Sequence, residues 1–151
     1  MNETRSTKEL SWNQYITLVN KLNYAIISCL KKNNIGIHFI YAIQRGGMIP
    51  GTILAHELGI NIVRNDFNEA YKIIAGNILI IDVISDTGRT LSEHVNKFVN
   101  NKDIKILTAT LHLNERSIFI PDFHVIKVAK NIYIKYPYEK ESDKLYSNSQ
   151  M

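Results

Sequence analysis

The chain has 151 residues, 45% of them hydrophobic, which allows one domain with a buried core. It has no apolar run near the roughly 20 residues that span a bilayer, and its polar start lacks the apolar stretch of a signal peptide. The net charge is +4, but the lysines are spread along the chain, and the single Cys29 excludes an internal disulfide. We therefore expect a cytoplasmic protein with neither a membrane nor a nucleic-acid partner.

The first predicted element is a long helix that begins after Ser11. Ser11 stands three residues before Gln14, which is the spacing of a capping box at a helix N-terminus. Apolar residues then recur with a helical period as far as Cys29, and the polar stretch 33–36 ends the helix.

Strands and helices alternate over the first two thirds of the chain. Short apolar runs predict strands at 37–43, 60–63, 78–81, 104–111, 123–128 and 132–136, and helices are expected at 51–58 and from 89 to about 99. The polar stretch 64–75 is weakly patterned and is expected to be a loop. This order is typical of an α/β fold with a mainly parallel sheet flanked by helices. We expect one domain over residues 1–151, with 1–9 and 140–151 flexible.

The segment 78–90 has the features of a phosphate-binding turn. The apolar strand 78–81 leads into a short turn and a helix, so free backbone N–H groups and the helix dipole would face a ligand at the carboxyl end of the strand. Gly88 lets the backbone approach closely, and Asp82 and Asp86 lie where a sugar hydroxyl, a metal ion or a base nitrogen can meet them. The hydroxyl groups available to phosphate oxygens belong to Ser85, Thr87 and Thr90. The alternative is an ordinary strand-to-helix turn with common N-cap residues.

A second glycine-containing turn follows the strand at 37–43. It reads Gln44-Arg45-Gly46-Gly47, with Pro-Gly at positions 50 and 51. Taken alone, it is equally well explained as a simple turn before a helix. However, it precedes the segment 78–90 by one strand-helix unit, and this order matters for the resemblance described next.

Together the two segments resemble the type I phosphoribosyltransferases, enzymes that use 5-phosphoribosyl-1-pyrophosphate (PRPP). Segment 78–90 is similar to the PRPP motif of that family, an apolar strand followed by acidic residues and Asp-Thr-Gly-x-Thr. Segment 41–51 is similar to its pyrophosphate loop, in which a non-proline cis peptide bond is often found. The resemblance implies that pyrophosphate is held by Arg45 and by the amides of Gly46 and Gly47.

The same resemblance assigns roles to the residues of the PRPP motif. Asp82 would contact the ribose hydroxyls and reach Mg²⁺ indirectly, through ribose or water. Asp86 would lie near the five-membered ring of the base as a catalytic general base, and Arg45 would stabilise the departing pyrophosphate. The 5′-phosphate of PRPP would be bound by Ser85, Thr87, Gly88, Arg89 and Thr90.

A third and weaker match lies near the C-terminus. Residues 132–139 resemble the ending of small bacterial xanthine-guanine phosphoribosyltransferases and their relatives, whose last strands form a small hood. There the first aromatic residue stacks on the purine, so the resemblance implies that Tyr133 stacks on the base and that carbonyl groups near Ile134 read its edge. A core tyrosine in a strand is the alternative. The resemblance extends from about residue 10 to residue 139.

Three features depart from the family pattern. Val83 stands where the family has a second acidic residue, so one carboxylate of the pair is missing. The alternative is that alternation along the strand points the Val83 side chain into the core. His112 stands where 6-oxopurine enzymes of the subgroup have a lysine that donates to the oxygen on carbon 6; a histidine can donate there, or can be an ordinary strand-end residue. The lid expected at 64–75 is short.

The resemblance predicts an enzyme that joins the ribose 5-phosphate of PRPP to a purine base and releases pyrophosphate in purine salvage. The expected bases are the 6-oxopurines guanine, xanthine and hypoxanthine, the expected cofactor is Mg²⁺, and the expected assembly is a homodimer or tetramer. Two alternatives stay open. One is a catalytically weakened regulatory module that binds PRPP or a nucleotide, which Val83 and the short lid favour; the other is an enzyme for a different acceptor base.

Overall fold

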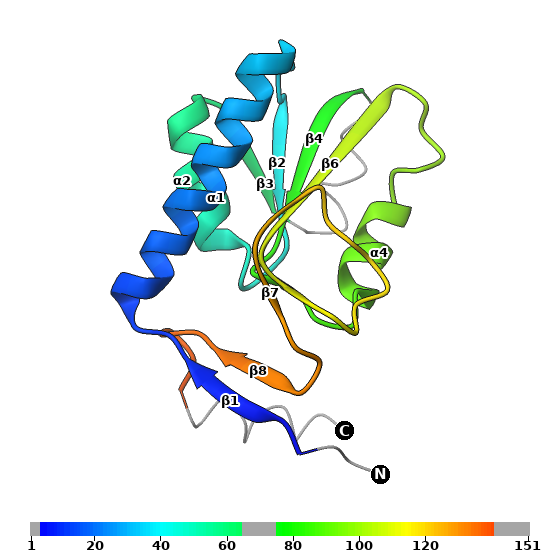
Figure 1. Cartoon of the computed structure of the whole chain (residues 1–151). Helices are drawn as coiled ribbons and strands as arrows, with labels where there is room; N and C mark the ends of the chain where they lie inside the picture. The colour runs from blue at the N-terminus through cyan, green and yellow to red at the C-terminus, as the bar shows by residue number, and fades with distance from the viewer. Residues whose placement is uncertain (1–3, 65–74, 141–151) are drawn as a thin grey trace.

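The computed structural model describes residues 4–64 and 75–140, which form an α/β arrangement of strands and helices (Figure 1). Among these residues, no helix combines the length and hydrophobicity that a membrane crossing requires. In chain order the elements are β1 (Ser6–Glu9), α1 (Trp12–Asn33), β2 (Phe39–Ala42), α2 (Met48–Leu58), β3 (Asn61–Arg64), β4 (Gly76–Ile81), β5 (Ile84–Ser85), α4 (Arg89–Asn96), β6 (Ile104–Asn114), β7 (Phe123–Val128) and β8 (Ile132–Lys135).

The main sheet has the strand order β3-β2-β4-β6-β5, and β7 also pairs with β6. All of these pairs are parallel, which confirms the expected mainly parallel sheet. In the centre, Ile40 of β2 pairs with Leu79 of β4, and Ile80 of β4 pairs with Thr108 of β6. Because neighbouring strands run in one direction, the loops after β2, β4 and β6 lie at one edge of the sheet.

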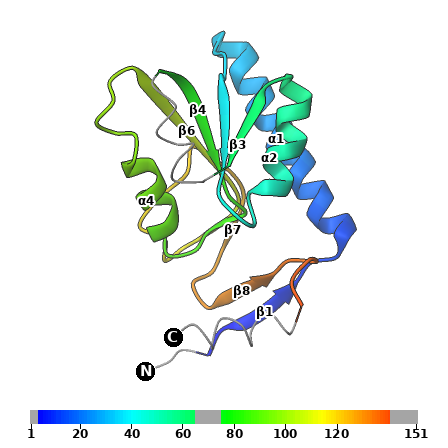
Figure 2. The same ribbon diagram turned by 180° about the vertical axis from the view of Figure 1, so that it is seen from behind.

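Helices cover both faces of the sheet, as Figures 1 and 2 show from opposite sides. Successive residues of β4 point to opposite faces, which is why this strand reads as a continuous apolar run. Leu79 belongs to a core shared with Leu22 of α1 and Leu54 of α2, whereas Ile80 belongs to a second core with Leu91 of α4.

The helix ends follow the sequence signals closely. Ser11 Oγ accepts from the backbone N–H of Gln14 at 3.1 Å, and Gln14 Oε1 accepts from the N–H of Ser11 at 2.9 Å, so the capping box is confirmed. Helix α1 ends at Asn33, and Asn34 takes the left-handed conformation with φ 52°. Helix α2 begins at Met48 rather than after Pro50, because a proline within the first turn removes no helical hydrogen bond.

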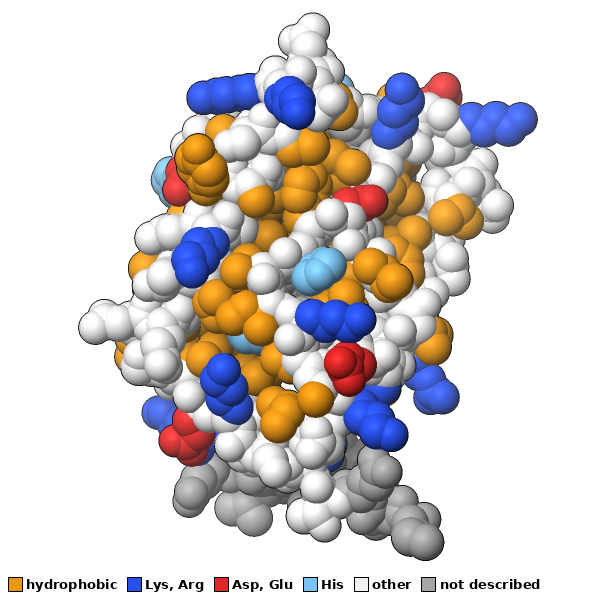
Figure 3. Space-filling model, in the orientation of Figure 1, with side chains coloured by type: hydrophobic (Ala, Val, Ile, Leu, Met, Phe, Trp, Pro, Cys, Tyr) orange, Lys and Arg blue, Asp and Glu red, His pale blue; other side chains and the backbone are white. Residues whose placement is uncertain are grey.

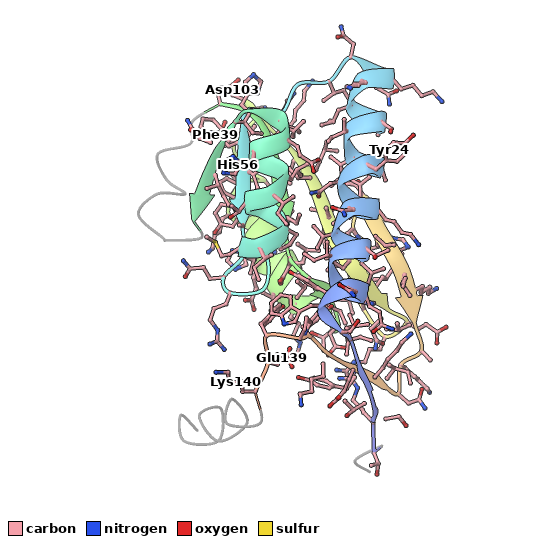
Figure 4. All side chains as sticks on the ribbon, turned by 90° about the vertical axis from the view of Figure 1, so that its left-hand side faces the viewer. Tyr24, Phe39, His56, Asp103, Glu139 and Lys140 are labelled. Atoms are coloured by element: carbon pink, nitrogen blue, oxygen red, sulfur yellow. The ribbon has the colours of Figure 1, made fainter. Side chains whose placement is uncertain are left out.

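The two ends of the described chain together form a small second sheet. β1 and β8 pair in parallel, from Ser6 opposite Ile132 to Glu9 opposite Lys135. Residues 6–9, expected to be flexible, are therefore an ordered strand, because they supply the backbone partners of β8. This two-stranded hood lies beyond the carboxyl ends of the main strands (Figure 1), and Figure 4 places Glu139 at that end and Phe39 and Asp103 at the other.

The expected lid at 64–75 and the expected flexible C-terminal segment fall mostly outside the described residues. On the face seen in Figure 3, Lys and Arg side chains are scattered among hydrophobic and uncharged groups and form no continuous basic patch.

Candidate active site

The turn after β2 packs against the end of β4. The Ile43 N–H donates to the Ile81 carbonyl oxygen at 3.0 Å, and a Cβ atom at Gly47 would collide with that same oxygen. The peptide bond between Gln44 and Arg45 is cis, as the resemblance implied. The Gly47 N–H donates to the Ile43 carbonyl oxygen at 2.8 Å, so this amide is already engaged within the turn and is not free for pyrophosphate.

Gly46 brings the two predicted loops into contact. A Cβ atom there would lie 2.6 Å from Val83 Cγ2 and 3.2 Å from Asp82 Oδ1, which is too close for most side chains. Arg45 is exposed beside it. Within the described part of the chain, the backbone N–H groups of Arg45 and Gly46 have no hydrogen-bond partner. These two amides and the Arg45 guanidinium are therefore available to an anion.

Helix α4 begins at Arg89, and its N-cap residue is Gly88, whose φ of 84° favours glycine. A Cβ atom on Gly88 would also meet the backbone nitrogen of Phe119 at 2.6 Å, because the segment 117–119 packs against this turn. Among the described residues, the N–H groups of Thr87, Gly88 and Thr90 have no hydrogen-bond partner. A helix start with free N–H groups is a general phosphate-binding feature.

The hydroxyl of Ser85 is already engaged inside the protein. Ser85 is 1% exposed, and its Oγ lies 2.8 Å from Ser117 Oγ and donates toward the Phe119 carbonyl oxygen at 3.0 Å. The sequence pattern grouped Ser85 with the threonines, but the short strand β5 turns its side chain inward. We therefore leave Ser85 out of the proposed phosphate contacts.

Asp82 is partly buried at the end of β4, and its neighbour Val83 is buried in the core. Burial raises the pKa of Asp82 to about 7, although the Val83 N–H, which donates to Asp82 Oδ1 at 2.7 Å, acts in the other direction. Val83 is 6% exposed and belongs to the core beneath α1. Its side chain thus packs in the interior, and the departure from two acidic residues leaves Asp82 as the carboxylate at this position.

His112 is 1% exposed and is held inside the protein. Its Nδ1 lies 2.8 Å from the hydroxyl of Tyr136, and that hydroxyl donates its hydrogen to the Val83 carbonyl oxygen at 3.0 Å. Because Tyr136 has one hydroxyl hydrogen, the imidazole must donate from Nδ1. Burial, aided by the charge of Lys8, lowers the pKa of His112 to about 4, so the ring is neutral. This geometry does not support the predicted contact with a base.

Asp86 is bound by two arginines that the sequence motifs did not single out. Arg5 donates through Nη1 and Nη2 at 3.0 and 2.8 Å, and Arg116 donates through Nε and Nη2 at 3.2 and 2.7 Å. Burial alone would raise the pKa of Asp86, but the hydrogen bonds and charges of the two arginines outweigh it and lower that pKa. No sequence pattern marked Arg5 or Arg116, because each reaches Asp86 only through tertiary packing.

Tyr133 lies at the hood, next to this cluster. Its ring is 37% exposed, its hydroxyl donates to Glu139 Oε2 at 3.0 Å, and the Arg5 guanidinium carbon lies 5.9 Å from the ring centre. Ile134, the other predicted base contact, has a buried side chain, so it can offer a ligand only its backbone.

Comparison with known proteins identifies the family. No family model matches the chain. A xanthine-guanine phosphoribosyltransferase from Desulfotalea psychrophila is 30% identical to it in an alignment of 118 residues that covers 68% of this chain and 71% of that protein. The chain belongs to the type I family of purine phosphoribosyltransferases. This family is a group of glycosyltransferases.

Solved structures agree with the fold of this phosphoribosyltransferase. A purine phosphoribosyltransferase from Pyrococcus horikoshii superposes with a TM-score of 0.67 at 23% identity, covering 89% of this chain and 94% of that one. A protein from Neisseria gonorrhoeae with bound ppGpp gives a TM-score of 0.74 at 17% identity, covering 96% of both chains.

A first prediction concerns Val83 of the phosphoribosyltransferase. Replacing it as Val83→Asp should reduce the free energy of unfolding by about 3–5 kcal/mol at pH 8, because an unpaired carboxylate would be buried. The loss should shrink at pH 5, where a buried carboxyl can stay protonated. Urea denaturation at both pH values measures this, with Val83→Asn as the uncharged control of equal shape. A stable Val83→Asp protein with higher PRPP affinity would instead show that position 83 faces the ligand.

A second prediction concerns Asp82. Its folded-state pKa of about 7 exceeds the value near 3.9 expected in an unfolded chain, so the folded state binds an extra proton between these limits. The contribution of Asp82 to stability should therefore be greatest below pH 4 and should be lost as the pH rises through 7. The unfolding free energy of the wild type minus that of Asp82→Asn should decline over this window. The exposed Asp103→Asn serves as control; parallel curves for wild type and Asp82→Asn would contradict the raised pKa.

Proposed function

We propose that this protein transfers the phosphoribosyl group of PRPP to a 6-oxopurine base and releases pyrophosphate. The observation that carries the proposal is the meeting of two anion-binding features at one edge of the sheet. The Arg45–Gly46 turn, whose amides are unpaired among the described residues, contacts Asp82, and α4 starts seven residues after Asp82. One ligand with a phosphate at one end and a pyrophosphate at the other can use both features.

The phosphate end of PRPP is proposed to lie at the start of α4. The N–H groups of Thr87, Gly88 and Thr90, unpaired among the described residues, lie at the start of the helix, where the helix dipole favours an anion. Thr87 Oγ1 accepts from the Arg89 N–H at a long 3.3 Å, a contact that a phosphate oxygen can replace. The exposed guanidinium of Arg89 adds a positive charge beside the turn.

The pyrophosphate end is proposed to lie at Arg45 and Gly46. In the reaction the bond between the sugar carbon and pyrophosphate breaks, a bond to the base nitrogen forms, and the base loses its proton. Negative charge builds up on the departing pyrophosphate, so a guanidinium and backbone N–H groups aimed at it favour the transition state. Arg45 is therefore the proposed catalytic group on this side.

The donor set also fits Mg²⁺, as part of the proposal. Asp82 supplies one carboxylate, and Mg²⁺ commonly uses one or two carboxylates together with substrate phosphates and waters. When bound, Mg²⁺ would neutralise charge on the pyrophosphate. Because the pKa of Asp82 is raised to about 7, the arrival of a cation would favour its ionised form.

The base is proposed to lie between Tyr133 and Asp86. Tyr133 is 37% exposed, with the Arg5 guanidinium carbon 5.9 Å from its ring centre, and Asp86 stays ionised because its pKa is lowered. A carboxylate with four donated hydrogen bonds is a weak proton acceptor, so a general-base role for Asp86 requires that at least one arginine release it. Purine salvage, a cytoplasmic location and a homodimeric or tetrameric assembly complete the proposal by resemblance.

A regulatory role is the second candidate, and two observations favour it. Val83 is buried where the family pattern has an acidic residue, and a protein of the same fold was crystallised with bound ppGpp. A nucleotide with pyrophosphate groups presents the same kind of anionic group as PRPP. Such a module would bind PRPP or a nucleotide without turning it over.

We expect nucleotide formation when the protein is given PRPP, Mg²⁺ and guanine, xanthine or hypoxanthine. Pyrophosphate release and the nucleotide product should appear together, as measured by a coupled pyrophosphate assay and by chromatography. A sample without base separates transfer from simple PRPP hydrolysis. Adenine and uracil complete the panel: product with uracil alone would indicate another acceptor, and binding without pyrophosphate release would favour the regulatory role.

Tyr133→Ala should weaken the binding of a purine nucleotide by about 1–3 kcal/mol, the scale of a lost base–aromatic stack. Isothermal calorimetry with inosine monophosphate measures the change. Tyr24→Ala is the matched control, because Tyr24 is 76% exposed on α1 and points away from the hood (Figure 4). Equal dissociation constants for wild type and Tyr133→Ala would return Tyr133 to a structural role.

A further inference from the structure

The Asp86 cluster presents cations, rather than a bare carboxylate, to the proposed base position. Both oxygens of Asp86 accept from both Arg5 and Arg116, so the carboxylate is fully engaged by donors. A nucleotide base has acceptor atoms on its exposed edge, and two acceptors facing each other gain no hydrogen bond. The guanidinium groups bound to Asp86 supply hydrogen-bond donors in place of the carboxylate acceptors.

Arg5 is fixed in place by the hood. It directly precedes β1, whose Ser6 N–H donates to the Asn131 carbonyl oxygen at 2.8 Å, and its Nη2 donates to the Ile132 carbonyl oxygen at 2.6 Å. Both terminal nitrogens are thus engaged, and its Nε is buried without a hydrogen-bond partner among the described residues. Arg5 is therefore suited to hold Asp86 in position rather than to bind a ligand itself.

Arg116 has different surroundings. It follows β6, and its backbone N–H donates to Oδ1 of the buried Asn114 at 3.0 Å, which fixes the start of its loop. Its Nε and Nη2 both bond Asp86, whereas its Nη1 makes no hydrogen bond within the described part of the chain. The side chain is 39% exposed, so it can meet a ligand.

We propose that Arg116, oriented by Asp86 and Arg5, is the residue that reads an exocyclic oxygen of the base. The inference rests on the proposed function, which puts the base between Tyr133 and Asp86. His112 cannot take this role in the described geometry, because it is buried and its Nδ1 hydrogen is directed to Tyr136. Arg116 is a specificity-determining binding residue, and Arg5 is a positioning residue.

This arrangement selects oxo bases over amino bases. The Nη1 group of Arg116 can only donate, so it matches a carbonyl oxygen at carbon 6 and meets another donor when an amino group stands there. The charge of Arg116 also attracts any nucleotide phosphate, but that effect is the same for both bases. The ratio of the two affinities is therefore the quantity that isolates base reading.

The test uses the full chain and isothermal calorimetry with inosine and adenosine monophosphates. We expect the wild type to prefer inosine monophosphate by roughly 5- to 100-fold, the usual range for one good guanidinium contact to a base edge. Arg116→Gln should bring that ratio close to one, Arg116→Lys should keep part of it, and Arg5→Gln should lower it less than Arg116→Gln. Lys105→Gln is the control, since it removes one positive charge at the amino end of β6, opposite the site.

Each outcome separates the inference from the proposed function. An unchanged ratio in Arg116→Gln, with both nucleotides still bound, would overturn the role of Arg116 and leave the proposed function standing. Tighter binding of both nucleotides by Arg5→Gln, with an unchanged ratio of the two affinities, would also overturn the inference. Arg5 would then block the proposed base position instead of positioning Asp86. A wild type that binds neither nucleotide and releases no pyrophosphate from PRPP would instead reject the proposed function.

Discussion

The parallel pairing of β2 with β4 is the constraint on which the site depends. It aligns Ala42 with Ile81, so the turn at 44–47 must lie directly against the loop that begins at Asp82. No side chain larger than hydrogen fits at Gly47, where a Cβ atom would meet the Ile81 carbonyl oxygen, and Gly46 is nearly as crowded by Val83. The glycines therefore serve first to let two backbones approach. Among the residues that the structure describes, this turn leaves the amides of Arg45 and Gly46 unpaired.

Those parts of the fold with local causes could be predicted from the sequence. The Ser11–Gln14 capping box, the doubly buried strand ending at Ile81 and the order of strands and helices each depend on neighbours along the chain. The sequence also predicted that the two glycine-containing turns lie at the same edge of the sheet, because parallel strands place their carboxyl ends together. Residue types were enough to locate the edge of the sheet where a phosphate ligand can bind.

The parts that the sequence did not reveal depend on contacts between distant residues. Pairing of β1 with β8 joins segments more than a hundred residues apart, and the sequence pattern of neither strand predicts its partner. Arg5 reaches Asp86 only because of that pairing, so a residue assigned to a flexible terminus becomes part of the site. Ser85 shows the converse, since it belongs to the motif by sequence but is turned inward by its pairing with Leu113.

Val83 and His112, which depart separately from the family pattern in sequence, belong to one structural unit. Tyr136 joins them, because its hydroxyl contacts His112 Nδ1 at 2.8 Å and the Val83 carbonyl oxygen at 3.0 Å. A charged side chain at either position would have to be desolvated in this interior, whereas the present residues satisfy each other as neutral groups. Arg5 and Arg116 both bind Asp86. Val83 and His112 are thus neutral parts of the interior, whereas the positive groups that meet Asp86 come from the hood and from the loop after β6.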